Sequence, residues 1–295
     1  MILRAVFRRW ALLALLLVAA CGDTPTSPPQ QGGPALWRVQ RGDLDGYLFG
    51  TVHVLPDRTA WRTPTLEKAI DASDRLVLEI GNLGDRDAVI DAFERLGRAP
   101  DLPPVAERIT PEARRALDKL SANGTASAGA LAPYKDWAAA MLLSAAIQQK
   151  MGVSEDNGVE PLLTARFRDA GKPLEGLETL DQQFGAFDAL PPATQRRMLE
   201  ETILDAGRMP ALMDEVVKAW QRGDLAAIAR ADTGRRRPDP LVEQGVIAAR
   251  NRAWAVKIDR MRGRPFIAVG TAHLADDHTL VAMLESRGFT VRRIQ

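Results

Sequence analysis

The sequence predicts an α/β fold in which a central mixed sheet is completed by strands from both ends of the chain, with a large helical middle region. Two apolar, β-rich runs follow residue 35, and a strand, a helix and a further strand close the chain. Residues 181–261 carry a mostly helical pattern that proline-containing stretches interrupt. The composition, 46% hydrophobic and 26% charged over 295 residues, excludes collagen-like, coiled-coil and wholly disordered chains.

The expected strands are short apolar runs bounded by turns. The first two are joined by the polar turn RGDLDG, the third is the compact run RLVLEI, and the fourth follows a glycine that ends a helix. The last two flank the final helix of the chain. In chain order, the expected strands are residues 36–39, 47–52, 75–80, 172–177, 265–271 and 289–294.

The expected helices have recognisable ends or faces. Thr63 and Thr110 are good N-caps, and each precedes a proline, which suits the first position of a helix. Residues 134–151 are apolar nearly all round, which predicts a buried helix. Gly171 ends the helix expected at 159–170. In chain order, the expected helices are residues 63–73, 110–124, 134–151, 159–170 and 279–287, with several more within 181–261.

The first 34 residues are expected to be an export signal and a tether. Three arginines precede the apolar run ALLALLLVAA, which is shorter than the about 20 residues of a transmembrane helix. The run ends at Cys21 in a pattern that resembles a bacterial lipobox, although an incidental cysteine after a plain signal is the alternative. The next residues are rich in Pro, Gly, Gln, Ser and Thr. We expect a signal peptide at 1–20, a flexible tether at 21–34 and a single domain at 35–295, anchored to the periplasmic face of the outer membrane.

Charge and cysteine content exclude several functions. The formal charge of +1 falls by three, to −2, when the arginines of the signal are removed, so the mature chain has no electrostatic footprint for nucleic acid. The single cysteine excludes an intramolecular disulfide and any cysteine-rich metal or iron–sulfur site.

Two segments that lie 220 positions apart have the same form. LFGTVH ends at His53 and AVGTAH ends at His273, so each is an apolar strand that runs into Gly-Thr-x-His. The glycine lets the backbone turn, and the histidine then lies at the sheet edge where open α/β folds place ligands. Glu79, near the end of RLVLEI, is the third candidate. Two imidazoles and one carboxylate are a sufficient set of ligands for a divalent metal, whereas capping or hydrogen-bonding roles are the simpler alternative.

Taken together, the motifs resemble the TraB/GumN family, which includes the Tiki-type membrane-associated metalloproteases. In order from residue 36 to the C-terminus they are LFGTVHVLP, LVLEI, GKPLEGLETLDQQ, AARNRAWAVKI, FIAVGTAHL and RGFTVRRI. The resemblance implies an α/β fold related to erythromycin esterase-like and ChaN-like proteins. It also implies a divalent-metal peptidase site formed by His53, His273 and Glu79, for which we expect Mn, Co or Zn.

Further polar residues match the family's pattern. Glu178 and Gln182 in GLETLDQQ could contact a metal-bound water, the substrate or a ligand histidine, or Glu178 could only start a helix. Arg250 and Asn251 are candidate substrate-binding residues, and the alternative for Arg250 is an ion pair with a buried carboxylate.

Glu160 departs from the family, which usually has aspartate at its position, so its role is open. His278 matches no family histidine, and we expect it at the surface.

Two functions from different classes follow. The first is a lipid-anchored, metal-dependent hydrolase, in which Glu178, Glu160 or Glu79 itself acts as the base. A peptide is the substrate that the resemblance implies, although an ester or lactam of a small molecule needs the same groups. The second is a non-catalytic lipoprotein that binds haem, a metal or a peptide in the same cleft, with only Tyr47 and Tyr134 available as phenolate ligands.

Overall fold

A computed structural model describes residues 32–81, 84–153, 157–231, 239–275 and 278–295. The expected signal peptide, Cys21 and most of the expected tether lie outside these residues. The described chain forms two compact units. The sheet unit consists of residues 32–81, 157–179 and the described part of 212–295, and the helical unit consists of residues 84–153 and 180–211.

The sheet unit is built on one six-stranded mixed sheet, with the strand order β4-β3-β5-β2-β1-β6. Its strands are β1 (Leu36–Arg41), β2 (Leu44–Thr51), β3 (Arg75–Ile80), β4 (Leu174–Glu178), β5 (Pro265–Gly270) and β6 (Thr290–Arg293). Strand β1 pairs antiparallel with both β2 and β6. The prediction of a mixed sheet completed by strands from both ends of the chain is therefore confirmed.

Four neighbouring strands of this sheet run in the same direction. The pairs β4 with β3, β3 with β5, and β5 with β2 are all parallel. Thr51 at the end of β2 lies opposite Gly270 at the end of β5, and Ile80 at the end of β3 lies opposite Glu178. The carboxyl ends of four strands thus meet at one edge of the sheet, which is where open α/β folds bind ligands.

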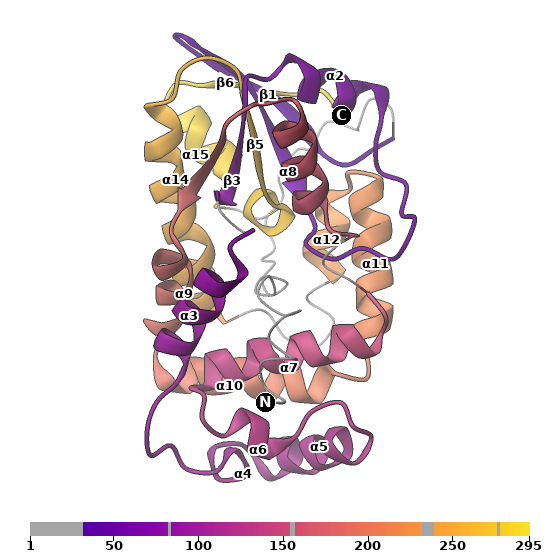
Figure 1. Ribbon diagram of the computed structural model, residues 1–295, viewed down its shortest axis with the longest axis vertical. Coiled ribbons are helices and arrows are strands. Elements are labelled where there is room, and N and C mark those ends of the chain that lie inside the picture. Colours follow the sequence, from indigo (N-terminus) through magenta and orange to yellow (C-terminus); the bar gives the residue numbers. More distant parts are fainter. Residues whose placement is uncertain (1–31, 82–83, 154–156, 232–238, 276–277) are drawn as a thin grey trace. The chain divides into compact units, whose positions relative to one another are not determined.

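Helices cover this sheet. One of them begins at Thr63, a capping residue that the sequence indicated, and another begins after Thr279, the first residue of the helix expected at 279–287. Thr63 accepts a hydrogen bond from the backbone N–H of Leu66, and Thr279 accepts one from that of Ala282. In Figure 1, α14 and α15 lie at one side of the strands and α8 at the other. The helical elements of this unit are α2 (Pro64–Ala72), α8 (Val159–Asp169), α11 (Met209–Gln221), α12 (Leu225–Ala231), α13 (Pro240–Val242), η2 (Glu243–Ala248), α14 (Ala249–Asp259), η3 (Thr271–Leu274) and α15 (Leu280–Ser286).

An aromatic cluster lies in the core of the sheet unit. Phe49 of β2 stacks on Trp61 and contacts Phe266 of β5, with ring centroids 6.1 and 5.8 Å apart. Trp220 of α11 contacts Trp61 and donates a hydrogen bond from its indole nitrogen to the carbonyl of Gly50, at 2.8 Å. This bond ties α11 to the glycine of the first Gly-Thr-x-His motif.

The helical unit is held together by a second aromatic cluster. Phe93, Trp137, Phe184 and Phe187 come from three helices, and Trp137 stacks on both Phe184 and Phe187. The prediction of a buried helix at 134–151 is confirmed, since α7 is buried on nearly all sides. The helices are α3 (Arg86–Gly97), α4 (Val105–Arg108), α5 (Pro111–Ala122), α6 (Ala128–Leu131), α7 (Asp136–Lys150), α9 (Leu180–Asp188) and α10 (Pro192–Asp205).

Within the described ranges, every helix is too short or too polar to cross a bilayer.

Candidate active site

The described candidates for the metal ligands, the base and the substrate-binding residues lie, with one exception, in the sheet unit. His53 follows β2, Glu79 lies in β3 and Glu178 ends β4. His273 lies in η3, the short 3₁₀ turn that continues β5. Arg250 and Asn251 lie in α14, and Glu160 lies in the first turn of α8. The exception is Gln182, which lies in α9 of the helical unit.

His273 is completely buried, and its ring is held from two sides. Its Nδ1 atom lies 2.7 Å from Oδ1 of Asn251, and the Trp254 ring packs with a centroid separation of 4.3 Å. Because an amide oxygen only accepts hydrogen bonds, Nδ1 carries the proton and Nε2 keeps its lone pair. Burial and the charge of Arg250 lower the pKa of His273 to about 3. The imidazole is therefore neutral, with its basic nitrogen on the side away from Asn251.

His53 is held in the same way by a different partner. Its Nδ1 atom lies 2.8 Å from Oε1 of Glu160, and the hydroxyl of Thr51 donates to the same oxygen at 2.5 Å. Burial raises the pKa of Glu160, but the charge and hydrogen bond of His53 outweigh burial and lower it overall. The carboxylate is thus ionised and fixes the orientation of His53, whose side chain remains 21% exposed.

Glu79 is a buried carboxylate with a partner at each oxygen. The backbone N–H of Gly270 donates to Oε1 at 2.7 Å, and the guanidinium of Arg250 donates to Oε2 at 2.7 Å. Oε1 also lies 4.0 Å from Nε2 of His273. Burial alone raises the pKa of Glu79, but Arg250 and the two nearby histidines lower it to about 2. Glu79 is therefore ionised at neutral pH.

Arg250 links the carboxylates to His273. Its Nε and Nη2 atoms donate to Glu178 at 2.5–3.1 Å, and Nη2 also donates to Glu79. Its Nη1 atom lies 3.2 Å from Nε2 of His273. The alternative of an ion pair with a buried carboxylate is what the structure shows for Arg250. Substrate binding by Arg250 stays a prediction.

Gly270 leaves an open position among the three proposed ligands. A Cβ atom placed there would lie 3.2 Å from Oε1 of Glu79, 3.6 Å from Nε2 of His53 and 3.9 Å from Cδ2 of His273. The backbone of Gly270 has an ordinary negative φ of −52°, so this position needs a glycine for space and not for conformation. The three side chains thus face one small volume at the sheet edge.

The nitrogen and oxygen atoms of the site are of the kinds that bind divalent metals, but they are not spaced as ligands around one ion. Nε2 of His273 carries no proton, and Glu79 and Glu160 are ionised beside the positive charge of Arg250. Such an acidic, imidazole-containing site attracts a cation. Within the residues described, however, no three His, Cys, Asp or Glu side chains are grouped closely enough to hold an ion as they stand. The metal site stays a prediction.

Some important residues of the site were not anticipated as such. Thr51 fixes Glu160, and Trp254 packs on His273 while its Nε1 atom donates to Glu178 at 3.1 Å. Thr51 belongs to the first Gly-Thr-x-His motif, so its position there was the available signal. Trp254 lies one helical turn beyond Arg250, and in the sequence it indicates only an apolar helix face.

Two other positions bear on the alternatives. His278 is exposed, as expected, and its carbonyl oxygen accepts a hydrogen bond from Nδ2 of Asn251 at 2.8 Å. Tyr134, a candidate phenolate ligand for haem, donates its hydroxyl proton to Glu94 at 2.5 Å. Burial and this bond raise the pKa of Tyr134 to about 12, so its hydroxyl stays protonated at neutral pH.

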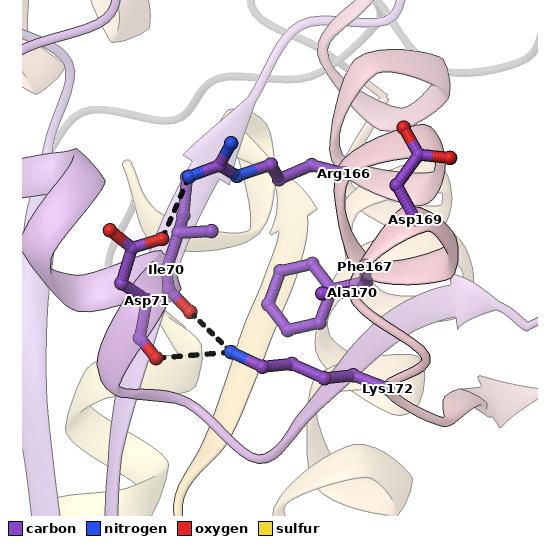
Figure 2. A pocket seen from close by; sticks show the side chains of 7 residues that line it. All are labelled: Ile70, Asp71, Arg166, Phe167, Asp169, Ala170 and Lys172. Atoms are coloured by element: carbon purple, nitrogen blue, oxygen red, sulfur yellow. Dashed lines mark hydrogen bonds and ion pairs between the residues drawn. The ribbon is translucent and has the colours of Figure 1, made fainter.

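A pocket of about 250 Å³ lies between α2 and α8 in the sheet unit (Figure 2). Three of its charged groups already have partners, because Arg166 pairs with Asp71 at 2.8 Å and Lys172 donates to the carbonyls of Ile70 and Asp71. None of the candidate site residues lines it. The candidate site at the sheet edge is therefore separate from this pocket.

The fold and the site together define an α/β protein with a buried His–Glu–Arg cluster at the carboxyl ends of parallel strands. The sequence model of the TraB/PrgY/gumN family matches residues 35–293, and the chain belongs to this family. The expected family resemblance is thereby confirmed.

Two curated relatives are similar over most of their length. These are the uncharacterized protein YbaP of Shigella flexneri and that of Escherichia coli (strain K12). Each is 26% identical over 257 residues, which cover 85% of this chain and 92% of the relative. No solved structure matches the chain.

Proposed function

We propose that this chain is a divalent-metal-dependent hydrolase, with a peptide as its substrate and with His53, Glu79 and His273 as the metal ligands. The observation that carries the proposal is the open position at Gly270, which both histidines and Glu79 face. A bound Mn, Co or Zn ion would polarise the scissile carbonyl and make water a better nucleophile.

The hydrogen bonds around the two histidines support this assignment. Histidines that bind metals usually donate their other ring nitrogen to a carboxylate or carbonyl, which fixes the ring and its tautomer. Asn251 accepts from Nδ1 of His273, and Glu160 lies at Nδ1 of His53. Nε2 of His53 faces the open position at Gly270, and Nε2 of His273 lies 4.0 Å from Oε1 of Glu79.

The three candidate bases, Glu160, Glu178 and Glu79, differ in their hydrogen-bond partners and in their basicity. Glu160 is engaged by His53 and Thr51, and Glu178 is engaged by Arg250 and Trp254. Glu79, with a pKa of about 2, is a weak proton acceptor and a suitable anionic ligand. We assign Glu79 to the metal, and we treat Glu160 and Glu178 as positioning residues that act through His53 and Arg250.

A peptidase assay with metal removal and reloading tests the proposal. The purified full chain is stripped with a chelator, reloaded with Mn²⁺, Co²⁺ or Zn²⁺, and given a library of fluorogenic peptides, with ester substrates in parallel. We expect hydrolysis that the chelator abolishes and one ion restores, and a loss of about a hundredfold or more in His53→Ala and His273→Ala. His278→Ala is the matched control. Hydrolysis that withstands chelation, or that His273→Ala retains, contradicts the proposal.

We further propose that Cys21 is lipidated and anchors the protein to the periplasmic face of the outer membrane. The support is the arginine-containing start of the chain, the apolar run and the lipobox-like end of that run. Cys21→Ser is expected to move the protein from the membrane fraction to the soluble fraction. Unchanged fractionation contradicts the anchor.

A further inference from the structure

We infer that Arg250 is a resident cation of the site: its guanidinium occupies the Nε2 lone pair of His273 in the metal-free chain, and an entering divalent ion must displace it from that nitrogen. The inference rests on the proposed function, because it concerns the same metal site. It adds a competition between a side chain and the ion.

The competition follows from the single electron pair on Nε2. Asn251 accepts from Nδ1 of His273, so Nε2 carries no proton and accepts a hydrogen bond from Nη1 of Arg250 at 3.2 Å. An sp² ring nitrogen has one lone pair in the plane of the ring. That pair cannot accept a hydrogen bond and bind a metal at the same time.

The rest of the guanidinium is held independently of His273. Nε and Nη2 form a forked pair with Glu178, and Trp254 donates to the other side of that carboxylate. The Trp254 ring also lies 4.6 Å from the centre of the guanidinium. Arg250 can therefore release His273 while Glu178 still holds it.

Arg250 also provides charge that the metal-free site needs. It is 4% exposed and pairs with Glu79 and Glu178, two carboxylates whose side chains are buried. Removing one partner of a buried ion pair leaves a costly unpaired charge. Loss of Arg250 should thus weaken the metal-free chain and favour the bound ion.

The helix geometry just before Arg250 supports a functional role for the position of its side chain. The segment before Arg250 is a π-helix, η2, in which the N–H of Ala249 bonds to the carbonyl of Gln244. Nη1 of Arg250 reaches back to the carbonyl of Val246, at 3.4 Å. Such π-segments occur often at functional sites, where they shift side chains from their regular helical positions.

Calorimetric titration of the chelated full chain with Zn²⁺ tests the inference, together with thermal unfolding before and after Zn²⁺ addition. Arg250→Met is expected to bind Zn²⁺ about tenfold or more tightly than the unaltered chain, the equivalent of one charge-assisted hydrogen bond. It should also unfold at a lower temperature without the ion and regain most of the difference with it. Arg252→Met removes the same charge from an exposed position of α14 and should change neither quantity.

A second variant covers the case in which Arg250→Met does not fold. Arg250→Lys keeps the charge, but one ammonium cannot reach both carboxylates and His273 together, so Zn²⁺ binding should again be tighter. Equal or weaker binding in the folded variants, with Zn²⁺ binding intact in the unaltered chain, overturns the inference alone. Absence of Zn²⁺ binding in all the proteins overturns the proposed metal site and the inference together.

Discussion

The Nδ1 atom of His273 lies 2.7 Å from Oδ1 of Asn251, and this contact decides which ring nitrogen carries the proton. Nδ2 of the same amide donates to the carbonyls of His273 and His278. These two donated bonds fix the orientation of the Asn251 amide. The amide in turn fixes the tautomer of the His273 ring and holds the turn that carries the ring.

Asn251→Leu should lower the affinity for Zn²⁺ by about ten- to a hundredfold, because the ring loses the acceptor that orients it. Asn251→Asp keeps an acceptor oxygen and should lose less. Calorimetric titration of the chelated variants measures both effects. If the leucine variant binds Zn²⁺ as the unaltered chain does, Asn251 does not orient a ligand.

Gly270→Ala should leave the chain folded and reduce Zn²⁺ affinity about tenfold or more, because displaced ligands weaken a site steeply. The added Cβ would lie 3.2 Å from Glu79 Oε1 and 3.6 Å from His53 Nε2. Circular dichroism checks the fold and calorimetry checks the binding.

The matched control for Gly270→Ala is Gly185→Ala, since a Cβ atom at Gly185 meets nothing within 4 Å. Its affinity should be unchanged, and its helix should gain up to about 1 kcal/mol in the free energy of unfolding. Normal Zn²⁺ binding by Gly270→Ala contradicts the role given to the open position.

Glu160→Gln separates a positioning residue from a base. Glutamine keeps an acceptor oxygen for Thr51 and for Nδ1 of His53, so peptide hydrolysis should fall by less than about a hundredfold. Loss of a general base costs about 10²–10⁴-fold. Glu160→Ala removes the acceptor altogether and should also cost about 1–3 kcal/mol in the free energy of unfolding. An equal, large loss of activity in both variants would instead make Glu160 the base.

The raised pKa of Tyr134 leads us to expect that the free energy of unfolding falls at high pH. Burial and the bond to Glu94 raise its folded pKa from 10.0 to about 12, so the folded chain holds this proton more tightly than the unfolded chain does. The stabilisation is complete below pH 10 and is lost as the pH rises from 10 through 12.

Absorbance at 295 nm measures that ionisation directly, because the chain has only two tyrosines. Tyr134→Phe should remove the transition near pH 12. If the transition near pH 12 persists in this variant, the phenol of Tyr134 is not the protected group.

Local signals in the sequence predicted much of the fold. Thr63–Pro64 and Thr110–Pro111 mark the starts of α2 and α5, because a threonine cap followed by proline satisfies the first turn of a helix. The run RLVLEI matches β3. The parallel arrangement of β3, β5 and β2 then brings the two Gly-Thr-x-His motifs and Glu79 to one edge.

The cluster around Arg250 depends on contacts that no local pattern contains. Its partners Glu79 and Glu178 lie 171 and 72 positions away. The π-helix η2 was not predicted either, since the residue types and periodicity of its sequence are also those of an ordinary α-helix. His273 was expected at the end of a strand and lies instead in a 3₁₀ turn, because the chain tightens directly after Gly270.

The metal content of the native protein tests the central claim most directly. The chain is purified without chelators, and its Mn, Co and Zn are measured by elemental analysis beside those of His273→Ala and His278→Ala. We predict about one divalent ion per chain in the unaltered protein and in His278→Ala, and a large loss in His273→Ala. An unaltered chain that holds no divalent ion after incubation with all three metals, or a His273→Ala chain that holds as much, would contradict a metal site formed by His53, Glu79 and His273.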